Sequence, residues 1–340
     1  MGKVDIGRVR EIDSLRGVFA ISVLAFHFFY RYDSYFTARP DNPFLSREPS
    51  VYEDFLGLIP VYFFFIISGF VITLTLERVP SAVDFAFARF SRLYPAYWAS
   101  IFLTSAILLA LPMPQLERTP FEIAVNLTMI QSVFNIPHVD GVYWSLYVEL
   151  CFYLFVFFLR FFDVWRYLPR ILIVWAITAV GYGFFDQKLN PVPTVIVDIF
   201  VLAYAHFFIA GMVFYRVGKQ GGFHPLDWVL LALCTVSAML RYPMEISLSI
   251  VGAFVVFGLV VTGHARILAT QPLLYLGSIS YSLYLIHQNI GYAIINHLDQ
   301  PFWIETVIAT VVAIVLSSGI TYLIERPGQR VLRRIWGYRR

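Results

Sequence analysis

The chain has 340 residues, of which 59% are hydrophobic, 18% aromatic and only 14% charged, with a formal net charge of +3. An average soluble domain carries about a quarter charged residues, so this composition excludes a soluble globular protein. It also excludes a disordered, collagen-like, coiled-coil or disulfide-stabilised chain. The small net charge argues against nucleic acid as a partner. We therefore predict an all-α, polytopic integral membrane protein whose surroundings are the lipid bilayer.

Stretches without Asp, Glu, Lys or Arg mark the expected membrane-spanning helices, because roughly 20 mostly apolar residues are needed to cross a bilayer. Letting several stretches extend past a flanking charge gives about ten transmembrane helices in a single membrane domain, residues 1–340. No small-residue cleavage site of a signal peptide follows the first span, so we expect this helix to be retained in the protein. The predicted spans are 13–31, 56–76, 95–112, 143–162, 170–186, 195–216, 226–241, 246–263, 273–297 and 304–323.

The basic residues predict the orientation of these spans. With the N-terminus inside, eighteen of the 25 Lys and Arg residues fall on the cytoplasmic side and six outside. Cytoplasmic loops are enriched in Lys and Arg, so both termini are expected in the cytoplasm and the chain in the cytoplasmic (inner) membrane. Segment 121–138 is apolar but contains several polar residues and a proline, so we expect a re-entrant or interfacial piece.

Ionisable residues inside a membrane are costly, which makes them functional candidates. In the first span Arg16 and His27 are eleven residues apart, so their side chains share one helix face, about 16 Å apart along the axis. Two structural alternatives stay open. Arg16 is also suited to anchoring the cytoplasmic end of the span, and His27 to packing in the core.

Three further features follow in the chain. Ser68-Gly69 is a small pair in a run of bulky residues, where a second helix or a ligand is able to approach closely. Arg89 and Arg92, in the loop before a span that we expect to begin at Pro95, form a fork suited to phosphate or to lipid headgroups. Glu149 lies in the outer half of a span, either as a neutralised structural acid or as the partner of a buried histidine or arginine.

The last third of the chain adds two weaker features. His287 ends the stretch Ser280-Tyr281-Ser282-Leu283-Tyr284-Leu285-Ile286-His287 and is a candidate for a polar network. Glu325 and Arg326 are expected to form an ion pair at a helix end. The two cysteines, Cys151 and Cys234, lie in apolar runs, where we expect them to pack as small apolar side chains. No Cys/His spacing predicts a metal site.

Together and in this order, these motifs resemble the acyltransferase family 3 membrane proteins, which O-acylate surface polysaccharides, nodulation factors, macrolides and related glycosides. The match runs almost from end to end. It rests on six motifs: Glu11-Ile12-Asp13-Ser14-Leu15-Arg16-Gly17 with His27, Phe65 to Phe70, Arg89 to Pro95, Trp144-Ser145-Leu146-Tyr147-Val148-Glu149, Ser280 to His287, and Glu325-Arg326-Pro327.

The resemblance implies transfer of an acyl group, usually acetyl, from cytoplasmic acyl-CoA to a hydroxyl of a glycan or glycoside. The family's Arg-x10-His pair falls on Arg16 and His27, and its Arg-x-x-Arg loop on Arg89 and Arg92. Some family members carry an esterase-like C-terminal domain; we expect the stand-alone form here. No metal is expected.

The chemistry of these residues fits that function. His27 suits a general base, since an imidazole takes a hydroxyl proton at neutral pH. Arg16 suits holding the donor or polarising its carbonyl, and Glu149 orienting His27 or the acceptor. Arg16, Arg89 and Arg92 are the predicted acyl-CoA contacts. The expected substrate or structural supports are Ser68, Trp144, Tyr281 and His287.

Two other classes compete with this interpretation. A transporter or flippase would suit the composition, but such proteins often show repeats in two halves, and none is found. A catalytically silent membrane partner would keep the same fold for assembly with other proteins but would have no enzymatic activity. The acceptor and the oligomeric state are not predicted. Aromatic residues in loops 32–55 and 113–142 suit either sugar stacking or an interfacial belt, namely Tyr32, Tyr35, Phe36, Tyr143 and Trp144.

Overall fold

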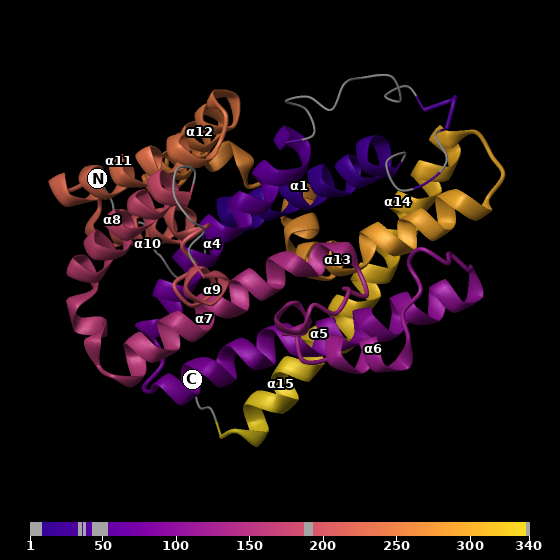
Figure 1. Cartoon of the computed structure of the whole chain (residues 1–340), viewed down its shortest axis with the longest axis horizontal. Coiled ribbons are helices and arrows are strands. Elements are labelled where there is room, and N and C mark those ends of the chain that lie inside the picture. The colour runs from indigo at the N-terminus through magenta and orange to yellow at the C-terminus, as the bar shows by residue number, and fades with distance from the viewer. Residues whose placement is uncertain (1–8, 33–35, 37–38, 43–53, 187–192, 338–340) are drawn as a thin grey trace. The chain divides into compact units, whose positions relative to one another are not determined.

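The computed structural model describes residues 9–32, 36, 39–42, 54–186 and 193–337, and every regular element in these ranges is helical (Figure 1). Seven helical stretches within them are long and apolar enough to cross a membrane. The chain is thus a multi-pass membrane protein. The seven stretches are Arg10–Arg31, Phe55–Leu76, Ala82–Ala110, Gly141–Phe161, Val164–Phe185, Met244–Val261 and Phe302–Ile335.

The chain divides into two compact units, neither of them a continuous stretch. The first consists of Leu58–Ala86 and Val148–Gln271 with the start of the chain up to Leu15. The second consists of Arg16–Gly57, Phe87–Tyr147 and Pro272–Arg340. Several helices contribute residues to both units, above all α1 (Arg10–Phe26), α5 (Ala82–Ala110) and α7 (Trp144–Phe161).

The centre of the first unit is the contact between α4 (Ile59–Leu76) and α10 (Ala205–Gln220). A Cβ atom at Gly69 would overlap the carbonyl oxygen of Phe208, and one at Gly211 would overlap that of Ile66. The small residue next to Ser68 therefore admits a second helix, one of the two alternatives its sequence left open. Around this pair lie α8 (Leu168–Asp186), α11 (Pro225–Arg241) and α12 (Met244–Val261).

In the second unit, α1 lies beside α13 (Gln271–His297), and the two helices run in the same direction. A Cβ atom at Gly17 would lie 2.7 Å from the backbone nitrogen of Gly277, and further along Phe28 packs on Gly291. The other elements of this unit are η1 (His27–Arg31), α6 (Pro120–Asn126), η3 (Gln131–Phe134), η4 (Gly141–Tyr143), α14 (Phe302–Gly319), η7 (Ile320–Glu325) and α15 (Arg326–Ile335).

The prediction of a loop that holds Arg89 and Arg92 before Pro95 is wrong. Helix α5 begins at Ala82 and holds Pro95 in its interior, so Arg89 and Arg92 lie on a helix and not in a loop. The start is capped, because Ser81 accepts a hydrogen bond from the backbone of Asp84 at 3.1 Å and donates one to its carboxylate. The charged residues in the first turns of α5 are the reason why the sequence predicted a later start.

Three of the ten predicted spans are not among the seven apolar stretches. Span 195–216 is interrupted: α9 (Thr194–Ile199) ends before α10 begins at Ala205, and Val201 between them has a left-handed φ of 51°. Span 226–241 coincides with α11, which has 17 residues. Span 273–297 lies in α13, whose 27 residues include many polar ones. The number of crossings and the orientation stay predictions.

Segment 121–138 contains only the short helices α6 and η3. One of its two buried amides, Asn126, donates to the carbonyls of Glu122 and Pro137 and accepts from the backbone of Val139 at 3.0 Å. The side chain of Asn126 in this irregular piece is thus satisfied by protein groups, as an interfacial or re-entrant piece requires. Short helices elsewhere are η2 (Asp54–Leu58), η5 (Val164–Tyr167) and η6 (Arg266–Leu268).

Candidate active site

His27 stands where the first helix changes its geometry. Residues Arg10–Phe26 form a regular α-helix, and His27 is the first residue of the π-helical segment η1. Such π segments within helices frequently occur at functional sites. The Nδ1 atom of His27 lies 2.9 Å from the carbonyl oxygen of Val23, one turn earlier, which fixes the direction of the ring.

The structure brings His27 into direct contact with His287 on α13. Nδ1 of His27 and Nε2 of His287 are 3.0 Å apart, and the two rings meet edge to face with centroids 4.9 Å apart. His287 is fully buried, and its own Nδ1 lies 3.1 Å from the carbonyl of Leu283 and 2.9 Å from that of Tyr284. Two motifs separated by 260 residues therefore form one imidazole pair.

The Trp144-Ser145 motif reaches α13 one turn before His287. The hydroxyls of Ser145 and Tyr284 are 2.7 Å apart, and both also lie within hydrogen-bond distance of the carbonyl of Val142. Trp144, the predicted support residue, is half-buried beside them. These contacts fix the part of α13 whose backbone carbonyls hold the His287 ring.

A second set of contacts fixes α13 just beyond His287. Asp140 is fully buried, and its carboxylate accepts hydrogen bonds from the backbone of Asn289 at 3.0 Å and of Val142 at 3.2 Å. The side-chain amide of Asn289 donates to the carbonyl of Val139 at 2.8 Å. Burial raises the pKa of Asp140 to about 7. The loop residues before α7 thus clamp α13 on both sides of His287.

Arg92 lies in a polar cluster that joins three of the motifs. Its guanidinium pairs with the carboxylate of Glu325, which also accepts from Ser282 at 3.0 Å, and Thr321 donates to Ser282 at 2.9 Å. The same guanidinium lies over the ring of Tyr281, with its central carbon 5.0 Å from the ring centroid. Glu325 thus pairs with Arg92, while Arg326, its expected partner, lies over Tyr322. Arg92 therefore has a structural role of its own.

The other two predicted basic residues lie on the same helices as these clusters. Arg16 is half-buried on α1, eleven residues before His27 and adjacent to the Gly17 contact with α13. At 1.5 Å per residue this places its backbone about 16 Å from that of His27. Arg89 is half-buried on α5, about one turn before Arg92.

Glu149 belongs to the first unit. Its carboxylate accepts a hydrogen bond from Ser68 at 2.8 Å, and a second from the hydroxyl of Tyr153. Two predicted site residues from separate motifs, Ser68 and Glu149, are thereby brought together. Because His27 belongs to the second unit, a pairing of Glu149 with His27 stays a hypothesis.

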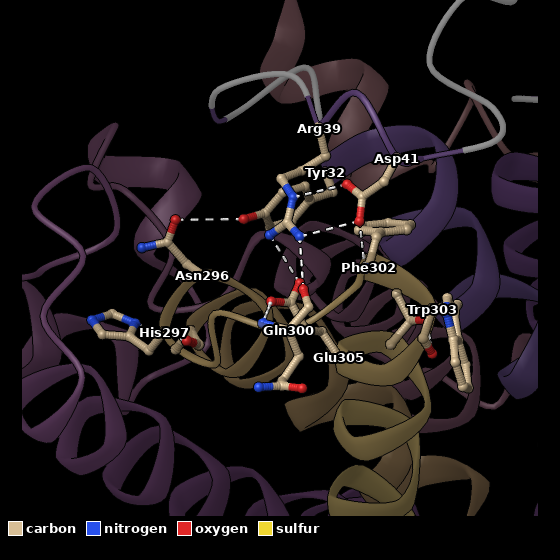
Figure 2. Close-up of polar contacts among 11 residues, drawn as sticks. Tyr32, Arg39, Asp41, Asn296, His297, Gln300, Phe302, Trp303 and Glu305 are labelled. Carbon is tan, nitrogen blue, oxygen red and sulfur yellow. Dashed lines mark hydrogen bonds and ion pairs between the residues drawn. The ribbon is translucent and has the colours of Figure 1, made fainter.

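A third polar network ties the segment 39–42 to the start of α14 (Figure 2). Arg39 donates to Glu305 at 2.9 Å and to Asp41 at 3.2 Å, and Asp41 accepts from the backbone of Phe302 at 2.7 Å. Glu305, fully buried, also accepts from the backbone of Gln300 at 2.9 Å. The Phe302 N–H and the Arg39 guanidinium hold the pKa of Asp41 below its ordinary value. This network caps α14 and anchors the segment.

Two of the aromatic residues expected at an acceptor surface or a belt are core residues instead. Tyr32 is 2% exposed and packs against Tyr292, whose ring also contacts His27 with centroids 6.5 Å apart. Tyr143 is fully buried against Tyr97. Phe36 packs on Tyr292 as well. Tyr35 and most of loop 32–55 lie outside the described residues, so this predicted acceptor loop is described only at 32, 36, 39–42 and 54–55.

The residues of these clusters that were not predicted as site residues include Ser145, Ser282, Asp140 and Asn289. The first two stood inside recognised motifs, and their place beside Trp144 and Tyr281 was the available signal. Asp140 and Asn289 gave no signal beyond being polar. Within the described residues, no group of three or more His, Cys, Asp or Glu side chains is placed to hold a metal ion.

The helical membrane fold and the buried polar clusters on α13 define the chain as a multi-pass membrane protein with a candidate catalytic centre. The family model for the acyltransferase domain of acyltransferase family 3 matches residues 9–322 of the chain. The chain therefore belongs to acyltransferase family 3, a family of enzymes that transfer acyl groups. No curated protein and no solved structure matches the chain.

Proposed function

We propose that this enzyme transfers an acyl group, most simply acetyl, from acyl-CoA on the cytoplasmic side of the inner membrane to a hydroxyl of a glycan or glycoside. The observation that carries the proposal is the contact of His27 with His287 within a membrane acyltransferase. O-acylation requires a base that removes a hydroxyl proton, and imidazole is the side chain best suited to this at neutral pH.

In the proposed reaction, His27 takes the proton of the acceptor hydroxyl through Nε2, because its Nδ1 is engaged with Val23 and His287. The acceptor oxygen bonds to the thioester carbonyl carbon, the carbon–sulfur bond breaks, and the leaving thiolate takes the proton from His27. Arg16 binds the donor, or stabilises the negative charge on its carbonyl oxygen in the transition state.

Coenzyme A is a polyanion, and arginine is the preferred residue for binding phosphate. Arg89 and Arg92 are the proposed contacts. Arg92 also pairs with Glu325, so its proposed contact with phosphate would add to an existing ion pair. Glu149, held by Ser68 and Tyr153, is proposed to orient either His27 or the acceptor.

The test uses the purified full chain in lipid nanodiscs, with acetyl-CoA and a set of glycan and glycoside acceptors, and it measures free CoA together with acylated product. We expect acceptor-dependent CoA release that His27→Ala abolishes without changing the amount of folded protein. The matched control is His297→Ala, an exposed histidine on α13 that bonds only to its own helix among the contacts described.

Wild-type activity in the His27→Ala variant would overturn the mechanism. Absence of CoA release with every donor and acceptor, combined with flux of a glycoside across the bilayer, would instead support a transporter. Comparing the acyl esters of envelope glycans and secreted glycosides with and without the gene would identify the acceptor.

A further inference from the structure

The contact between His27 and His287 fixes where the protons of both rings are. Carbonyl oxygens only accept hydrogen bonds, and Nδ1 of His287 faces two of them, those of Leu283 and Tyr284. Nδ1 of His287 therefore carries a proton. In a neutral imidazole the other nitrogen, Nε2, is then an acceptor.

The contacts of His27 lead to the same assignment independently. Its Nδ1 lies 2.9 Å from the carbonyl of Val23 and 3.0 Å from Nε2 of His287, and both of these atoms accept. Nδ1 of His27 must be the donor to them. The neutral ring of His27 then has its lone pair on Nε2, the form that a general base requires.

We propose that His287 is a positioning residue for the acyl transfer, which holds His27 in the Nδ1–H form and shares the proton that His27 takes up. This inference rests on the proposed function. When Nε2 of His27 receives the acceptor proton, the ring becomes cationic, and its hydrogen bond to Nε2 of His287 becomes charge-assisted and stronger. When the thiolate recovers that proton from Nε2, both rings return to their neutral form, so protons balance over the cycle.

A neutral histidine suits this place better than the carboxylate that often orients a catalytic histidine. His287 is fully buried, and an ionised carboxylate there would need its own compensating partners. An imidazole accepts the hydrogen bond of His27 without a permanent charge. Its orientation is fixed by backbone carbonyls of α13, a part of the helix that Ser145 and Asp140 hold on either side.

The test compares the effects of two substitutions at His287 on kcat. His287→Leu removes the acceptor, and we expect kcat to fall about 100-fold while the KM for acyl-CoA stays unchanged. His287→Gln supplies a carbonyl oxygen near the position of Nε2, and we expect it to keep kcat within about tenfold of wild type. His297→Leu on the same helix serves as the matched control and should leave kcat unchanged.

A double variant separates a positioning role from a merely structural one. If His287 acts through His27, adding His287→Leu to His27→Ala should not lower the residual rate any further. Spectra of protein labelled with ¹⁵N-histidine should show the Nδ1–H form of His27 in the wild type and in His287→Gln, and a mixture of forms in His287→Leu.

Equal losses of kcat in the Leu and Gln variants, or a further loss in the double variant, would overturn the inference. An Nδ1–H signal of His27 that stays unchanged in His287→Leu would also overturn the inference. Full activity in His27→Ala would instead contradict the proposed function. That single variant therefore tests the proposed function separately from the role of His287.

Discussion

Arg92 on α5 and Glu325 at the end of η7 form an ion pair across 233 residues of sequence. The side chain of Glu325 is 6% exposed, and that of Arg92 is 25% exposed. A carboxylate so buried depends on its partner, because an unpaired charge away from water is strongly unfavourable. Arg92 therefore has a structural role besides its proposed contact with phosphate, and the two arginines of the predicted phosphate fork should be tested apart.

Replacing Arg92 with alanine should chiefly weaken the fold. The free energy of unfolding should drop on the order of 2 kcal/mol, less than for a fully buried pair because the guanidinium is partly exposed. Thermal unfolding of the purified protein in nanodiscs measures the change. Adding Glu325→Gln to Arg92→Ala removes the unpaired charge and should restore most of the lost stability.

Replacing Arg89 with alanine should chiefly weaken donor binding. Losing one charge-assisted hydrogen bond to phosphate should raise the KM for acyl-CoA about tenfold. Steady-state kinetics at varied acyl-CoA measures this. An unchanged KM in Arg89→Ala would overturn the proposed contact of Arg89 with phosphate.

The contact of α1 with α13 predicts a steric effect at Gly17. A Cβ atom there meets backbone atoms of Gly277 and Leu273 at 2.7 Å, so Gly17→Ala should push the two helices apart and separate His27 from His287. We expect loss of most of the acyl transfer. Gly319→Ala is the control, because a Cβ atom at Gly319 meets nothing within 4 Å. Normal transfer in Gly17→Ala would show that the pair tolerates displacement.

The buried carboxyl of Asp140 predicts a pH dependence of stability. Its pKa is raised from 3.8 to about 7 in the folded protein, so the folded chain keeps a proton that the unfolded chain releases between these values. This stabilisation is fully present below the lower value and is lost as the pH rises through the upper one. The unfolding temperature should therefore fall from about pH 4 to about pH 7 and level off above that, and Asp140→Asn should flatten that slope. The same slope in both proteins would assign it to other groups.

Glu149→Gln distinguishes the two alternatives for this acid. A glutamine side chain still offers an oxygen to Ser68 and Tyr153, so the unfolding temperature should stay close to that of the wild type. If the carboxylate orients a reacting group, kcat should fall at least about tenfold. Full activity in a stable Glu149→Gln protein would leave Glu149 as a structural acid.

Much of the helical fold follows from charge-free stretches, but the exceptions have physical causes. Helix α5 begins with a capped turn that contains Asp84, and it continues through Pro95, so a search for uncharged residues misses its first turns. Helix α13 is long but polar, because it carries His287 and Asn289 toward partners within its own unit. Hydropathy alone measures neither feature.

The candidate site was predicted as a set of residues and not as an arrangement. His27 was singled out by its depth in the first span, but nothing in the sequence tells that α1 lies beside α13 and brings His287 to it. The same holds for Glu325, whose neighbour Arg326 was the obvious partner while Arg92 is the actual one. Contacts between distant segments depend on helix packing, which single motifs do not encode.

The glycines on α1 and α13 also restrict the route by which substrates reach His27, the proposed base. At Gly17 the two backbones are too close for even one added carbon atom, and at Gly291 the ring of Phe28 fills the space. At these two points neither an acyl chain nor a sugar fits between the helices. We expect substrates to enter on another side of α1, so crosslinking of α1 to α13 should leave acyl transfer intact.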